Sequence, residues 1–223
     1  MTLFRLDASI RSDGSVSRAI ADIVERSWKV EHQDAEVIRR SVGLDPVPST
    51  TWPLAVSAGA TPEGEWNEAQ REAVTVAREL ASELLHGDSL LFAIPLYNFG
   101  ISQHSKAWVD VVITDPRLAS GGGQPLAGRP AVLVVVRGGA YGPGTPREGW
   151  DHATGWMRRI LADVWELDLR IVETEFTLAG QNPALDQFIE MAAEMRATAE
   201  LLAAEQGRHL AGSDVDADAT PPG

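Results

Sequence analysis

The chain has 223 residues, a formal net charge of −13 and 44% hydrophobic residues. The length suits one α/β domain, and the hydrophobic content is that of a folded chain rather than a disordered one. The acidic excess disfavours nucleic acid as a partner, because such a partner needs a basic surface. No Cys occurs, which excludes disulfides, thiolate nucleophiles and cysteine-based metal sites.

The first half of the chain alternates predicted strands and helices. A strand at residues 3–6 precedes a helix whose apolar residues recur at positions 20, 23, 24 and 28. A second strand is expected at 36–40, and the Pro-, Thr- and Ser-rich stretch from 43 to about 66 is predicted to be irregular. The apolar positions from 73 to 84 indicate the next helix, which we expect Gly87 to end in a left-handed conformation.

The second half continues the alternation. Residues 89–94 and 131–136 are continuous apolar runs, as expected of central strands buried on both faces. A helix is expected between them at about 102–113, followed by a flexible loop at 119–123. Thr145-Pro146-x-Glu148 predicts a helix start, since it combines a capping box with Pro at the first helical position. The charged strand at 169–176 suits a sheet edge, and a last helix is expected from Asn182-Pro183 to about 206.

Five strands with intervening helices predict an α/β fold, namely a three-layer flavodoxin-like domain with a five-stranded parallel sheet. We expect this domain to span residues 1–209 and the acidic tail at 210–223 to be disordered. No apolar run approaches the ~20 residues of a membrane span, and a strand pattern starts almost at Met1. The expectation is therefore a cytoplasmic protein without a signal peptide or a membrane partner. The five His residues show no metal-ligand spacing, so no metal is expected.

Three unusual loops follow three of these strands, at the carboxyl ends where ligands bind to parallel sheets. In the first loop, Ser9 ends the strand and Gly14-Ser15-Val16-Ser17-Arg18 opens a helix. Free amides and short hydroxyl groups at a helix start suit a phosphate, although Ser15 or Ser17 could equally serve as a plain N-cap. The loop lacks the glycine fingerprints of a dinucleotide site or a P-loop.

The second loop, Pro95-Leu96-Tyr97-Asn98-Phe99-Gly100, offers flat apolar surface beside amide groups, as an isoalloxazine ring requires. The third loop, Arg137-Gly138-Gly139, begins a stretch with four Gly in the seven residues 138–144, which lets the main chain pass close to a ligand. Either loop alone could be an ordinary turn. Together, the three loops predict a site for flavin mononucleotide (FMN).

The motifs Ser9-x-Arg11-x-x-x-Ser15-x-Ser17-Arg18, Pro95-Leu96-Tyr97-Asn98-Phe99 and Arg137-Gly138-Gly139, at these separations, resemble those of the FMN-dependent NADH-azoreductase family. The resemblance covers roughly residues 2–205. It implies a homodimeric, flavodoxin-fold NAD(P)H:quinone oxidoreductase that takes two electrons from NADH or NADPH and passes them to quinones or azo compounds by a ping-pong mechanism. The FMN contacts that it implies are Ser9, Ser15, Val16 and Ser17 for the phosphate, Leu96, Tyr97, Asn98 and Phe99 along the isoalloxazine, and Val136, Arg137, Gly138 and Gly139 at its other edge.

The chain also departs from the family. Val136 stands where many members carry Ser, Tyr141 stands where some carry His, and residues 115–124 lack the aromatic-containing loop that covers the flavin. Tyr97, Tyr141 and His104 are candidate proton donors, but water could serve, so no residue is assigned as catalytic. Two alternatives stay open: a flavodoxin-type FMN electron carrier without its own substrate, and a domain that has lost FMN and binds a partner.

Overall fold

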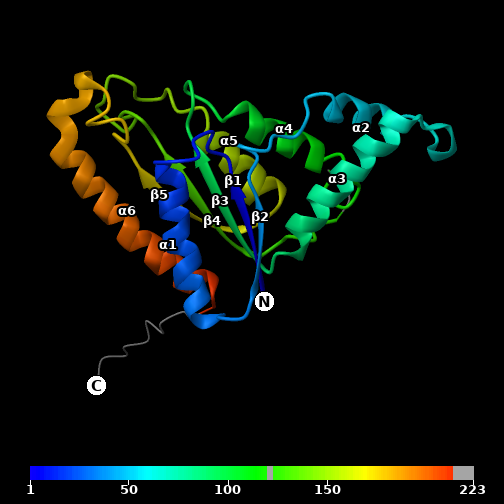
Figure 1. Cartoon of the computed structure of the whole chain (residues 1–223), viewed down its shortest axis with the longest axis horizontal. Helices are drawn as coiled ribbons and strands as arrows, with labels where there is room; N and C mark the ends of the chain where they lie inside the picture. Colours follow the sequence, from blue (N-terminus) through cyan, green and yellow to red (C-terminus); the bar gives the residue numbers. More distant parts are fainter. Residues whose placement is uncertain (120–122, 213–223) are drawn as a thin grey trace.

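A computed structural model describes residues 1–119 and 123–212 and contains one parallel sheet. Its strands lie in the order β2-β1-β3-β4-β5 (Figure 1). The strands are β1 (Thr2–Asp7), β2 (Glu36–Arg40), β3 (Ser89–Pro95), β4 (Pro130–Val136) and β5 (Asp168–Thr174). The five-stranded parallel sheet predicted from the sequence is confirmed, as is the edge position of the charged fifth strand.

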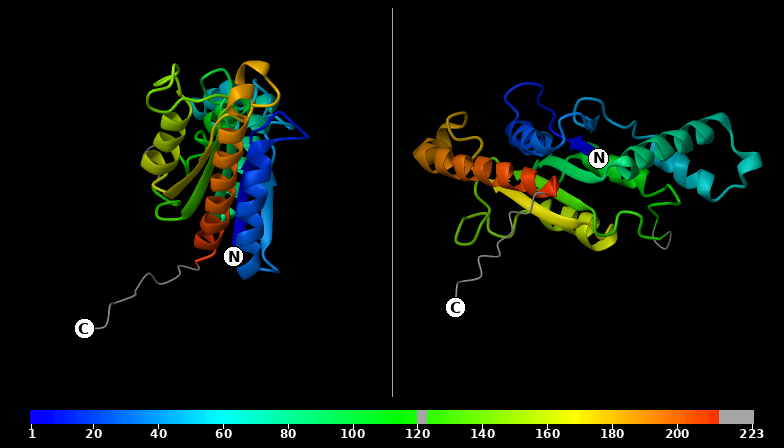
Figure 2. Two further views of the ribbon diagram at one scale, coloured as in Figure 1. Left: turned by 90° about the vertical axis from the view of Figure 1, so that its left-hand side faces the viewer. Right: turned by 90° about the horizontal axis from the view of Figure 1, so that it is seen from below.

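Helices cover both faces of the sheet (Figure 2). Helices α1 (Val16–Glu31) and α6 (Ile189–Leu210) pack on one face. The other face carries α3 (Glu68–His86), α4 (Gln103–Val112) and α5 (Thr154–Arg158), which continues as a π-helical segment (Arg159–Val164). Helix α2 (Thr51–Gly59) packs on α3. The result is the predicted three-layer architecture.

Strand periodicity divides the core between the two faces. Leu91 of β3 packs toward α1 and α6, whereas its neighbours Leu90 and Phe92 pack toward α3 and α4. Successive side chains of a strand point to opposite faces, so a central strand must be apolar throughout. All seven residues of β3 are buried, which explains the continuous apolar run in the sequence.

The prediction of an irregular stretch from 43 to 66 is wrong. Helix α2 occupies Thr51–Gly59, and a 3₁₀ turn follows at Glu63–Glu65. Pro53 is tolerated because it lies in the first turn, where its missing N–H has no helical partner. Thr51, Ala55 and Ala58 bury one face of α2. The helix is short, and Pro and Ser obscured its helical spacing.

The predicted left-handed cap at Gly87 is also wrong. Gly87 ends α3 with φ −70° and ψ 117°, an extended conformation that any residue can adopt. Its lack of a side chain matters for another reason, since a Cβ there would lie 2.7 Å from Cβ of Phe4 and 2.8 Å from Cδ2 of Leu90. Glycine is needed at this position for close packing against the start of the sheet.

The helix start predicted at Thr145-Pro146-x-Glu148 is wrong as well. Residues 145–149 form turns, and α5 begins at Thr154. Both capping side chains are engaged inside the loop: the Thr145 hydroxyl donates to the Gly142 carbonyl at 2.8 Å, and the Glu148 carboxylate accepts from the Gly144 amide at 2.8 Å. A capping motif therefore formed local turn bonds rather than a helix end.

The C-terminal helix differs at both ends from its prediction. Asn182-Pro183 opens a 3₁₀ helix (Pro183–Phe188), with the Asn182 side chain accepting from the Ala184 amide. Helix α6 then extends to Leu210 rather than to about 206. Residues 120–122 of the loop predicted to be flexible, and residues 213–223 of the predicted tail, lie outside the described residues.

Candidate functional site

The three loops of interest meet at one edge of the sheet because their strands end in register. The hydrogen-bond ladder continues past the strands: the Ala8 amide donates to Ala93 O at 3.0 Å, and the Leu96 amide donates to Val136 O at 2.9 Å. Residues 8, 96 and 137 therefore start their loops at neighbouring positions. The sheet brings the three sequence motifs together as predicted.

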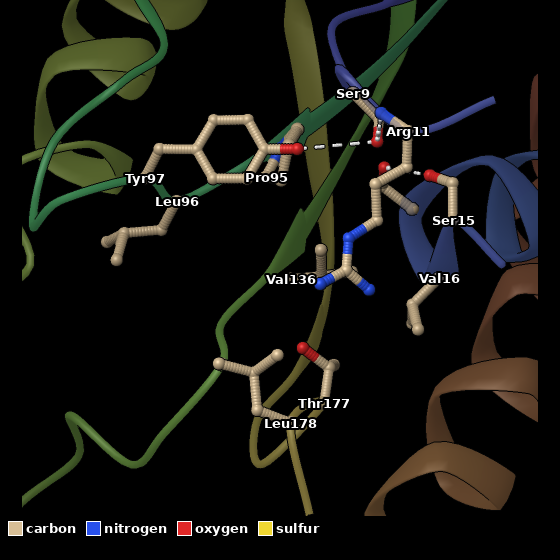
Figure 3. Close-up of a pocket in the computed structure, with 12 residues that line it drawn as sticks. Ser9, Arg11, Ser15, Val16, Pro95, Leu96, Tyr97, Val136, Thr177 and Leu178 are labelled. Carbon is tan, nitrogen blue, oxygen red and sulfur yellow. Dashed lines mark hydrogen bonds between the residues drawn. The ribbon is translucent and has the colours of Figure 1, made fainter. Parts of the chain in front are cut away.

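A first cavity of about 200 Å³ lies between these loops (Figure 3). Its walls are apolar below the ring of Tyr97 and polar near the start of α1. The side chain of Arg11 extends across it toward Val136. The lining residues are Ser9, Arg11, Ser15, Val16, Ser17, Pro95, Leu96, Tyr97, Val136, Gly138, Thr177 and Leu178.

The polar end of the first cavity is the N-terminus of α1. Ser15 is the N-cap, and its hydroxyl accepts from the Arg18 amide at 3.4 Å and lies 3.3 Å from the Ser17 hydroxyl. Ser9 lies across from them and is nearly fully buried. Ser15 therefore caps α1 and also lines the first cavity. Hydroxyls around free helix amides form a suitable anion site.

Tyr97 connects the second loop to the first. Residues 97–100 form a two-residue hairpin turn in which Tyr97 and Gly100 exchange amide-to-carbonyl bonds of 3.0 Å. Asn98 and Phe99 both have positive φ, 48° and 67°, as a type I′ turn requires. The turn places the Tyr97 hydroxyl 3.4 Å from Ser9 Oγ (Figure 3).

The side chain of Arg137 has a structural role. Its guanidinium is buried and donates to Asp151 at 2.7 Å, to Glu173 at 3.0 Å and to the Thr154 hydroxyl at 2.9 Å. The pKa of Arg137 is lowered by burial, but Glu173 and Asp151 outweigh this effect and raise it above its ordinary value. Arg137 does not line the first cavity, so the predicted contact there rests on the main chain of residues 137–139.

The end of β5 supplies residues that the sequence analysis missed. The Thr177 amide donates to Arg137 O at 3.1 Å, and the Leu178 amide donates to Gly138 O at 3.2 Å. Gly138 is tightly covered, since a Cβ there would lie 2.7 Å from Leu178 Cδ1. The sequence does contain a signal for them. Thr177 and Leu178 follow a fifth parallel strand, and the carboxyl ends of parallel strands lie at the same edge of the sheet.

A buried ionic network lies beneath the first loop. Arg5 and Asp7 of β1 point toward α1, and Arg5 donates to both oxygens of Asp7 at 3.1 Å and to Glu25 at 3.0 Å. Arg18 pairs with Asp7 at 3.4 Å and donates to Ser9 O at 3.0 Å. Arg18 thus fixes the main chain of the loop, while Arg11 lines the cavity and reaches Gln181 at 3.2 Å.

A second cavity of about 370 Å³ adjoins the first and shares Leu96, Tyr97, Gly138 and Leu178 with it. Its remaining lining residues are Asn98, Phe99, Gly139, Tyr141, Arg147, Asn182, Ala184 and Leu185. The shared residues join the two cavities into one groove. Its polar end suits a phosphate, and its apolar middle with amide edges suits a flat ring.

The candidate proton donors are not equivalent in position. Tyr141 lines the second cavity and Tyr97 lines both, whereas His104 on α4 lines neither. The Tyr97 hydroxyl already accepts from the Ile10 amide at 3.3 Å. Across residues 1–119 and 123–212, no three His, Asp or Glu side chains are grouped to hold a metal ion. In the same ranges no helix has the length and apolar character to cross a membrane.

Comparison with known proteins gives concordant results. The Flavodoxin_2 family model, described as a flavodoxin-like fold, matches residues 1–199. The chain is 36% identical over 199 residues to an FMN-dependent NADH:quinone oxidoreductase of Frankia casuarinae, covering 88% of this chain and 94% of that protein. It is 34% identical over 211 residues to one of Streptomyces avermitilis, covering 94% and 97%.

Solved structures support the fold. An FMN-dependent NADH-azoreductase of Bacillus anthracis in complex with FMN superposes with a TM-score of 0.76 at 16% identity, covering 95% of this chain and all of that one. The azoreductase AzrA superposes with a TM-score of 0.73 at 20% identity, covering 94% of this chain. At these identities the likeness establishes the shared fold.

Replacing Asp151 with Asn is expected to destabilise the protein by about 2 kcal/mol at pH 7, since partly buried hydrogen bonds to a charged group are lost. Burial raises the pKa of Asp151, but hydrogen bonds from Thr154 and Arg137 outweigh it and hold the pKa below the ordinary 3.8. The carboxylate therefore stabilises the fold fully above about pH 4, and this contribution disappears as the pH falls through the lowered pKa.

Urea denaturation of wild type and variant at pH 7 and pH 3 measures this difference. The control is Asp163→Asn, which removes the exposed partner of Arg159 and should change stability by less than about 0.5 kcal/mol. A deficit of Asp151→Asn that is unchanged at pH 3 would contradict the proposed role of the ionised carboxylate.

Proposed function

Because the chain belongs to the FMN-dependent NADH:quinone oxidoreductase family, within the flavodoxin-like fold, we propose that it binds FMN and transfers two electrons from NADH to quinones. The observation that carries this proposal is the single groove at the carboxyl edge of the sheet. Serine hydroxyls and helix amides lie at one end of the groove, and apolar and glycine-rich walls form the rest.

The chain's own residues would bind and orient the cofactor. Ser9, Ser15 and Ser17 and the first amides of α1 would hold the phosphate, and the dipole of α1 would favour its negative charge. The proposed ring site lies along residues 96–99 and 136–139, most of which line one or both cavities. FMN would supply the redox chemistry, accepting a hydride from the nicotinamide and giving two electrons to the acceptor.

The groove also supports the proposed order of events. The ring site opens on the side of Phe99 and Tyr141, where the second cavity lies. We propose that the donor and the acceptor enter the second cavity in turn, which gives a ping-pong mechanism. Azo compounds are proposed as further acceptors, since they too are flat and take electrons in pairs. Tyr97, Tyr141 or water would provide protons.

The alternative of an electron carrier without its own substrate is less well supported. A carrier exposes its flavin edge to a partner protein and needs no substrate cavity. Here a cavity of about 370 Å³ extends beyond the ring site. Loss of FMN is disfavoured in turn, because Ser9, Ser15 and Ser17 all line the first cavity beside the start of α1, as a phosphate site requires.

Anaerobic titration with NADH tests the proposed function directly. The FMN-reconstituted protein is expected to lose its visible flavin absorbance in one two-electron phase, and to recover it when a quinone is added. Accumulation of a one-electron form during the titration would favour the carrier. A flavin that binds but is reduced by neither NADH nor NADPH would refute the oxidoreductase.

Ser15→Asp is expected to weaken FMN binding by at least about tenfold, because it places a carboxylate where the phosphate would lie. Asp is as good an N-cap as Ser, so α1 should remain intact. Fluorescence titration of the apoprotein with FMN measures the affinity. The control Ser12→Asp adds the same charge to the exposed part of the loop, where the side chain does not line the first cavity. Equal FMN affinities of both variants and wild type would show that the phosphate does not bind at Ser15.

We further propose a homodimer. Trp52 and Val56 lie four residues apart on one face of α2 and are each about half exposed, which supports burial against a second copy. Light scattering is expected to give twice the 24.0 kDa of the chain, and Trp52→Glu should shift the mass toward the monomer. A monomer mass for the wild type would exclude the dimer.

A further inference from the structure

Three aromatic side chains, Phe99, Tyr141 and Trp150, form a cluster at the second cavity that we call the aromatic rim. Phe99 lies at the centre, with its ring centroid 5.4 Å from that of Trp150 and 6.3 Å from that of Tyr141, both in edge-to-face arrangement. Phe99 and Tyr141 line the cavity directly. The rim therefore joins the second loop to the segment that follows β4.

The aromatic rim exposes apolar ring surface to solvent. Phe99 is 38% exposed and Trp150 is 50% exposed, although the two rings contact each other. Exposed aromatic surface at the mouth of a cavity is typical of a ligand-binding site. This exposed ring surface suits contact with a flat aromatic molecule.

Arg147 adds a positive charge to this rim. Its guanidinium carbon lies 5.8 Å from the ring centroid of Phe99 and 5.9 Å from that of Tyr141. Stacking on aromatic rings holds a guanidinium in place. Nη1 of Arg147 also donates a long hydrogen bond of 3.5 Å to the Tyr141 hydroxyl, so this N–H is engaged and the others can bind an anion. The side chain also lines the second cavity.

The charge of Arg147 is not neutralised by its surroundings. Among the described residues, no carboxylate lies within 4.0 Å of its guanidinium nitrogens. The nearby carboxylates are engaged elsewhere: Glu175 accepts from the Tyr141 amide and faces Arg137 at 3.7 Å, and Glu148 accepts from the Gly144 amide. Arg137, by contrast, is fully paired. Arg147 is thus an available cation in a protein with a net charge of −13.

We propose that Arg147 and the aromatic rim select electron acceptors that carry an anionic group, a carboxylate or a sulfonate, on a flat aromatic ring. This inference rests on the proposed function and names its acceptor class. The ring would lie against Phe99 and Tyr141, and the guanidinium would bind the anionic substituent through charge-assisted bonds. The overall negative charge repels anions, so a local cation decides whether such acceptors bind.

The position of Arg147 favours the acceptor over the donor as its ligand. The guanidinium touches the rings that would hold the reacting aromatic group, so it suits a charge attached directly to that group. The phosphates of NADH are separated from the nicotinamide by a ribose. The reduction of the flavin by NADH and its reoxidation by the acceptor can be measured separately. The two rates show whether Arg147 acts on the phosphates of NADH or on the anionic group of the acceptor.

Reoxidation of the reduced, FMN-loaded protein tests the proposal. Wild type and Arg147→Met are reduced anaerobically and mixed with 1,4-naphthoquinone or with 1,4-naphthoquinone-2-sulfonate. We expect the variant to react about fivefold more slowly with the sulfonate at low salt, as for the loss of an exposed ion pair, and within about twofold of wild type with the neutral quinone. Arg147→Lys should recover part of the loss. The rate at which NADH reduces the flavin of Arg147→Met should match that of wild type.

The control variant is Arg71→Met, which removes one positive charge from the exposed surface of α3, away from the groove. It is expected to leave both rates unchanged, which separates a local contact from a change in net charge. Equal slowing with both quinones in Arg147→Met, or slowing of the NADH half-reaction alone, would overturn the proposal.

Equilibrium binding gives a readout that does not depend on turnover. Calorimetric titration of the oxidised, FMN-loaded protein with 2-naphthoate and with the neutral 2-naphthamide is expected to show about fivefold weaker naphthoate binding in Arg147→Met and unchanged naphthamide binding. Equal binding of naphthoate to both proteins would overturn the anion preference. Failure of NADH to reduce the flavin would instead refute the underlying function, so the two failures are distinct.

Discussion

The common register of β1, β3 and β4 is the constraint on which the site depends. In a parallel sheet every strand delivers its following loop to the same edge, and here the interstrand bonds continue through Ala8 and Leu96 beyond the strand ends. Loops separated by about ninety and forty residues in the chain therefore begin side by side. A shift of one residue in any strand would move its loop and turn its apolar side chains to the wrong face.

Two arginines then fix the loops in place through ion pairs within the protein. Arg18 ties the main chain of Ser9 to Asp7 of β1, and Arg137 ties the end of β4 to Asp151 and β5. Buried charges are costly unless they are paired and hydrogen-bonded. Because their partners come from different segments, the pairs also hold those segments in position along the groove.

The groove divides its chemistry along its length. Hydroxyls and helix amides at the start of α1 suit an anion held in a fixed position. Apolar walls and close main chain in the middle suit a ring, and the exposed aromatic rim with Arg147 suits a molecule that enters and leaves. This gradient, from polar and buried to aromatic and exposed, is what an enzyme with a resident cofactor and an exchanging substrate requires. It also explains how an acidic protein could handle anionic ligands, since the relevant charges are local.

The sequence by itself determined the sheet, because continuous apolar runs such as residues 131–136 are required of strands buried on both faces, and it located the three loops at strand ends. Predictions were wrong where one residue type serves several local structures. Gly87 provides close packing rather than a left-handed turn, and Thr145 bonds within its loop rather than capping a helix. Only the tertiary structure decided that Arg137 is a buried structural ion pair and that Thr177, Leu178 and Arg147 reach the groove. The physical reason is that periodicity records burial along one element, whereas the partners of a side chain depend on elements distant in the chain.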